Sequence, residues 1–72
     1  MAKKKARLEK ARSLYTIVVE AMTKGDDEVA HAREDDLHLY ALKCVRDSVP
    51  GYRGIVAIAL QTEILAFNRW CA

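Results

Sequence analysis

The hydrophobic residues of this chain fall into three segments, each with the spacing of an amphipathic helix. In the first segment, from about Ala6 to Lys24, apolar side chains recur every three or four residues and share one wide face. A second segment, from about Asp27 to Asp47, carries a narrower apolar stripe, and a third runs from about Tyr52 almost to the last residue. The pattern therefore predicts an all-α fold of three helices.

Local signals predict where the helices begin and end. Gly25 suits the left-handed backbone position that terminates a helix, and Asp26 or Asp27 then caps the next one. Pro50 disfavours helical geometry at the residue before it, so residues 48–51 are expected to form a second turn. Because both connections are short, we expect an antiparallel helical hairpin with the third helix packed across it.

The third segment carries apolar side chains on two sides if it is helical throughout. Its broad face holds Val56, Ala59, Leu60, Ile64, Phe67, Trp70 and Cys71. A second stripe holds Ile55, Ile58 and Leu65, and only Gln61, Thr62, Asn68 and Arg69 are expected to be solvated. A helix that is apolar on two sides needs neighbours on two sides.

A second copy of the chain is the partner that this apolar excess predicts. Phe67, Arg69 and Trp70 add to the expected surface because aromatic residues and arginine are enriched at binding hot spots. The expected interface of a helical-bundle dimer comprises Ile17, Ile55, Ile58, Leu65, Phe67, Arg69 and Trp70.

The length and composition fit one small folded domain. With 72 residues the chain buries only about 60% of its unfolded surface, so assembly would add needed stability. A content of 51% apolar residues argues against intrinsic disorder. We assign residues 1–5 to a basic flexible tail and residues 6–72 to the helical domain. The early lysines precede an amphipathic segment and no secretory signal is expected, which favours a cytoplasmic location.

Charge is distributed unevenly along the sequence, although the net charge is only +2. Residues 20–36 are rich in aspartate and glutamate, whereas the start of the chain is basic. A nucleic-acid-binding accessory protein is therefore one alternative function, since a basic segment binds phosphates without sequence specificity. Its contacts would be Lys3, Lys4, Lys5, Arg7, Lys10 and Arg12.

A second alternative is a carboxylate–histidine metal site. Glu28 and His31, like Asp35 and His38, have the three-residue spacing that places acid and imidazole together on a helix. Glu63 falls on the broad apolar face of the third segment, where a carboxylate is costly unless it is paired. The candidate ligands are His31, Glu34, Asp35, His38 and Glu63.

No pattern in the sequence predicts catalysis or a cofactor. Cys44 lies on an apolar stripe and is expected to be a buried small hydrophobe, while Cys71 lies far from it along the helices. The expected function is that of a small non-enzymatic interaction module, an adaptor or inhibitor that self-associates through the third helix. Compact chains of this kind are common in phages and mobile elements. This expectation comes from the size class alone, and no residue of the chain indicates it.

Overall fold

The computed structural model describes the backbone of residues 2–67 and the side chains of residues 5–67. The helices are α1 (Ala2–Thr23), α2 (Asp27–Arg46) and α3 (Tyr52–Leu60), and a short 3₁₀ helix, η1 (Gln61–Ile64), follows α3 directly. The prediction of three packed helices is confirmed. The first helix begins at Ala2 rather than Ala6, so it includes most of the segment assigned to a flexible tail. Alanine and lysine are good helix formers, and nothing in that segment interrupts the helix.

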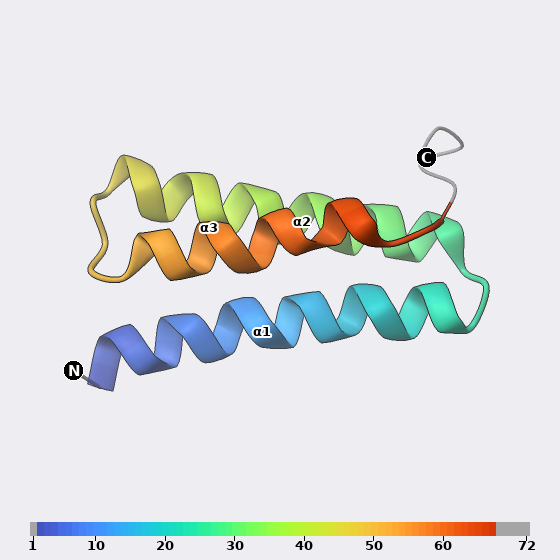
Figure 1. Cartoon of the computed structure of the whole chain (residues 1–72), viewed down its shortest axis with the longest axis horizontal. Coiled ribbons are helices and arrows are strands. Elements are labelled where there is room, and N and C mark those ends of the chain that lie inside the picture. Colours follow the sequence, from blue (N-terminus) through green and yellow to red (C-terminus); the bar gives the residue numbers. More distant parts are fainter. Residues whose placement is uncertain (1, 68–72) are drawn as a thin grey trace.

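The helices run back and forth along one axis of an elongated molecule (Figure 1), which measures 37 × 19 × 16 Å. Both α2 and α3 pack against α1 and against each other. As a result, the N-terminus lies at the same end as the α2–α3 turn, and the α1–α2 turn lies at the opposite end.

Both turns form where the sequence predicts them. Gly25 adopts a φ of 77°, and the Asp26 side chain caps α2 by accepting a 3.1 Å hydrogen bond from the Val29 amide. The second turn takes the chain through positive φ at Ser48 and Gly51, between the end of α2 at Arg46 and the start of α3.

The core is built largely from small and branched aliphatic side chains. Its main cluster comprises Ala11, Leu37, Ala41, Cys44, Ile55, Ile58 and Ala59. A second cluster near the α1–α2 turn comprises Val18, Ala21 and Ala30, against which Met22, Leu65 and Phe67 pack. The alanines allow the helix axes to approach closely, and Cys44 is buried as predicted.

The third helix is shorter than predicted, because the α-helix ends at Leu60 instead of continuing toward the last residue. The Ala59 carbonyl oxygen, which a continuing helix would use for the Glu63 amide, lies 3.1 Å from His38 Nε2 and 2.9 Å from the Thr62 hydroxyl. These two side chains compete for that acceptor, and the backbone tightens into η1. By Leu65 it is extended, with ψ at 130°.

Residues of the third segment that were expected at a partner interface pack inside the chain, and Ala59 of the broad face is buried with them. Phe67, also expected at that interface, packs against the second core cluster. Ile55 and Ile58, assigned to a partner interface, are buried within the chain, and Leu65 packs against the second core cluster. Thr62, expected in solvent, is only 1% exposed, because it continues the inward face through η1. The expected interface residues Arg69 and Trp70 lie outside the described residues.

Candidate interaction site

An apolar groove runs between α2 and α3. It is lined by His38, Ala41, Leu42, Val56, Ala59 and Leu60, and its walls are almost entirely carbon. The rims are formed by Leu42, which is 66% exposed, and Leu60, which is 59% exposed. Val45 lies one helical turn after Leu42 and extends the same side of α2. When large exposed aliphatic side chains are contiguous, they indicate a surface that contacts another molecule.

Hydrogen bonds hold the floor of the groove in place. His38 Nε2 lies 3.1 Å from the Ala59 carbonyl oxygen and 2.9 Å from Thr62 Oγ1. Because a carbonyl oxygen only accepts, the contact with Ala59 requires the tautomer in which Nε2 carries the proton. The Thr62 hydroxyl in turn donates to the same carbonyl over 2.9 Å. This network connects α2 to the α3–η1 junction and fixes the width of the groove.

Two other exposed apolar residues, Leu39 and Ile17, lie outside the groove lining and next to charged residues. Leu39, 52% exposed, lines a depression between α1 and α2 together with Lys10, Asp36 and Lys43. Ile17, assigned to the dimer interface by the sequence analysis, is 40% exposed and lines depressions formed by α1 and the α1–α2 turn. Neither of those depressions includes a residue of α3, so Ile17 lies apart from the groove.

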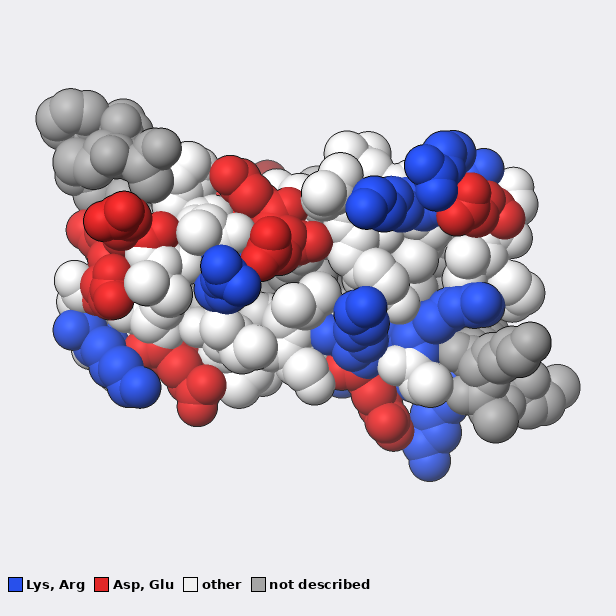
Figure 2. Space-filling model, turned by 180° about the vertical axis from the view of Figure 1, so that it is seen from behind, with Lys and Arg blue, Asp and Glu red and all other residues white. Residues whose placement is uncertain are grey.

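The fold converts the charge pattern of the sequence into two oppositely charged ends. Figure 2 shows basic side chains gathered toward one end of the visible face and acidic side chains toward the other. The acidic end, around the α1–α2 turn, includes Glu20, Asp26, Asp27 and Glu28. The basic end combines the start of α1 with the end of α2 and the start of α3, and includes Lys5, Arg7, Lys10, Lys43, Arg46 and Arg53.

The sequence pattern did not identify three of these cations as part of the basic surface. Lys43, Arg46 and Arg53 join the basic start of α1 because antiparallel hairpins bring those segments to one end (Figure 1). Pairing the predicted helices end to end is the signal that would have found them. Arg46 donates to Asp47 over 2.9 and 3.1 Å, which raises the pKa of the guanidinium and lowers that of the Asp47 carboxyl.

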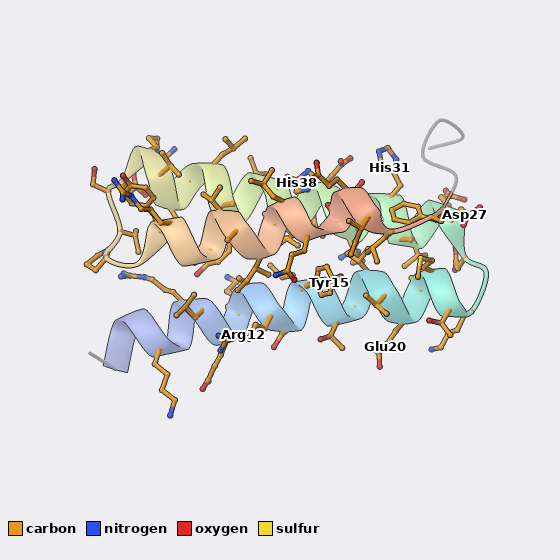
Figure 3. The ribbon with its side chains drawn as sticks, viewed as in Figure 1. Arg12, Tyr15, Glu20, Asp27, His31 and His38 are labelled. Atoms are coloured by element: carbon orange, nitrogen blue, oxygen red, sulfur yellow. The ribbon has the colours of Figure 1, made fainter. Side chains whose placement is uncertain are left out.

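The residues predicted to bind nucleic acid lie on α1. Lys5, Lys10 and Arg12 are exposed, and Figure 3 shows Arg12 directed away from the other helices. The ammonium of Lys10 lies 4.7 Å from the centre of the Tyr40 ring, a cation–π contact between α1 and α2. Arg7 is half-buried. The side chains of Lys3 and Lys4 lie outside the described residues.

The predicted metal ligands do not converge. His31 and His38 are separated by about two turns of α2, or roughly 10 Å (Figure 3). His31 Nε2 lies 3.6 Å from the Asp35 carboxylate, His38 is engaged with α3, and Glu34 is buried on the inner side of α2. Glu63 is exposed on η1. Among the residues with described side chains, no three His, Cys, Asp or Glu are placed to hold a metal ion.

Comparison with known proteins adds no relative. No family model matches the sequence, and no curated protein and no solved structure matches it either. Within the part of the chain that the structure describes, no helix has both the length and the apolar character needed to cross a membrane.

Proposed function

We propose that this protein is a small non-enzymatic helical interaction module, an adaptor or inhibitor, that binds another protein chain through the α2–α3 groove. The observation that carries the proposal is the contiguous apolar lining of the groove, with Leu42 and Leu60 exposed at its rims. The expected contact surface is therefore the outward side of α2 and α3, in place of the stripe containing Ile55 and Ile58.

The energetics favour covering of the groove by a partner. Burying a leucine side chain completely is worth about 1.5–3 kcal/mol, and the two rim leucines retain more than half of that area in solvent. The lining residues span about one turn of α2 and one turn of α3, so a small apolar patch on the partner is enough to cover the groove. Because hydrogen bonds from His38 already fix its floor, little ordering is required when the partner binds.

Site-specific photo-cross-linking in the organism of origin tests this proposal. A photoreactive phenylalanine analogue replaces Leu42 in one variant and Ile17 in a matched control, since both are exposed aliphatic residues but only Leu42 lines the groove. We expect a specific protein adduct from position 42 and none from position 17. Equal labelling from both positions, or an adduct confined within one chain at position 42, would contradict the proposal.

Binding to a nucleic-acid backbone is a second candidate function, favoured by one observation. The fold adds Lys43, Arg46 and Arg53 to the basic start of α1, so that three helices contribute cations to one end. Phosphate binding by such a patch releases counterions, and its affinity falls steeply with salt.

Fluorescence anisotropy with a labelled duplex tests the second candidate. We expect binding at about 0.05 M salt that weakens at least a hundredfold by about 0.2 M. Lys43→Glu should weaken it further, whereas Lys24→Glu, at the acidic end, should not. The absence of binding at low salt, or equal effects of the two substitutions, would exclude this function.

A further inference from the structure

The occupant of the α2–α3 groove that we infer is a second copy of this chain, packed in the opposite direction along the long axis. This inference rests on the proposed function and identifies its partner. It is carried by the way charged residues flank the apolar groove.

The groove has a cation on each helix toward one end and an anion on each helix toward the other. Arg46 on α2 and Arg53 on α3 lie at the end nearest the α2–α3 turn, and both are exposed. Asp35 on α2 and Glu63 on η1 lie toward the α1–α2 turn and are exposed as well. A single copy thus presents an apolar centre with opposite charges on its two sides.

The positions of these charges are balanced about one layer of the bundle. The contacts of His38 with Ala59 and Thr62 fix the register of the two antiparallel helices, and counting along them places Ala41 level with residues 56–59 at the centre of the groove floor. Along α2, Asp35 and Arg46 lie roughly 9 and 8 Å from Ala41 in opposite directions. Along α3 and η1, Arg53 and Glu63 lie roughly 7 and 9 Å from the middle of residues 56–59, in opposite directions.

A twofold axis through that layer, lying across the helices, brings unlike charges together. It lays α2 on the second copy's α2 and α3 on the second copy's α3, in antiparallel directions. Asp35 then approaches Arg46 of the other copy, and Arg53 approaches Glu63 of the other copy, so that each pair occurs twice. An axis parallel to the helices would place Arg53 near Arg46 of the other copy, which repels. Charge complementarity therefore selects both a second copy and its direction.

The existing contact between Arg46 and Asp47 does not oppose this arrangement. Both groups are exposed, and an exposed ion pair contributes little, so Arg46 exchanges or shares its partner at small cost. At the centre, Leu42 and Leu60 of each copy come to lie against the small floor residues of the other. The apolar layer supplies affinity, and the flanking charges determine the direction.

Charge reversal tests the arrangement, with dissociation constants measured by sedimentation equilibrium on the full chain. Arg53→Glu and Glu63→Arg should each raise the dimer dissociation constant about tenfold, because each places two like-charge pairs at the interface. The double variant should return close to the wild-type value. Leu42→Gln should abolish the dimer, and Ile17→Gln, a control at an exposed aliphatic position on α1 apart from the groove, should leave it unchanged. Both charged positions are exposed, and circular dichroism verifies that the variants remain folded.

Three results would overturn the inference. They are a wild-type chain that stays monomeric up to about 1 mM, a dimer that Arg53→Glu tightens, and a double variant that is not rescued. The proposed function fails separately. A monomeric purified chain whose position 42 still cross-links to a different protein refutes the second copy but retains the interaction module. If position 42 yields no specific adduct, both are refuted.

Discussion

The two faces of α3 carry similar aliphatic side chains and yet lie in opposite environments. Ile55 and Ile58 are buried between α1 and α2, whereas Leu60 extends into solvent beside the half-buried Val56. Hydropathy alone does not distinguish these faces, since both are apolar at helical spacing. The difference comes from the packing of α3 against two helices at once, which leaves one face for the core and the other for a contact outside the chain.

The largest expected effect comes from truncating the inward face. Ile55 is 0% exposed, so Ile55→Ala should reduce the free energy of unfolding by about 2–5 kcal/mol through lost burial and a cavity. For a domain of this size that is enough to unfold much of the population. The matched variant is Leu60→Ala, which should change the free energy of unfolding by less than about 0.5 kcal/mol. Both variants are measured by urea denaturation in a Leu42→Gln background. Equal losses would show that the two faces are not distinct.

The hydrogen-bonded end of the inward face should give a smaller effect. Thr62→Val removes the hydroxyl that joins His38 to the Ala59 carbonyl and should cost about 1–2 kcal/mol. Thr16→Val is a suitable control, because the Thr16 hydroxyl bonds only to its own helix at an exposed position. If both substitutions cost the same in thermal unfolding, the junction between α3 and η1 is not held by this network.

The fold was predictable wherever the determining signals are local. Gly25, Asp26 and Pro50 act on their own neighbours, and the turns and helix ends near them are confirmed. The end of α3 was not predictable, because the group that competes for the Ala59 carbonyl is His38, 21 residues earlier in the chain. Thr62, by contrast, lies four residues after Ile58 and seven after Ile55, so helical spacing alone places it on the buried stripe, and the expectation of solvent followed only from its polarity.

The sequence predicted that an apolar contact surface exists on the third segment, but not which residues form it. An excess of apolar surface on the third segment is visible in the sequence, and Leu60 remains outside the core. Which stripe turns inward depends on the direction from which α1 and α2 approach, and periodicity does not contain that information. The basic end similarly requires the antiparallel pairing that brings Lys43 and Arg53 beside the start of α1.

The smallest expected effect concerns the two sides of α2, of which one is covered by α1 and the other is open at the groove. Tyr40 lies on the covered flank, and partial burial, followed by its contact with Cys44, raises its pKa above 10.0. The neutral phenol therefore contributes stability that is complete below pH 10 and is lost as the pH rises through the folded-state pKa. Ultraviolet titration of the wild type minus Tyr40→Phe should show ionisation at a higher pH in the folded chain than in urea. Identical titrations would place Tyr40 in open solvent.

Light scattering on a sizing column tests most directly whether the outward face of α3 is a contact surface. Wild-type protein should elute at twice the 8.1 kDa chain mass, and the dimer should persist at high salt because its centre is apolar. Leu60→Gln should elute at the mass of one chain while remaining folded. A wild-type monomer at every concentration, or a Leu60→Gln variant that keeps the dimer mass, would contradict assembly through this face.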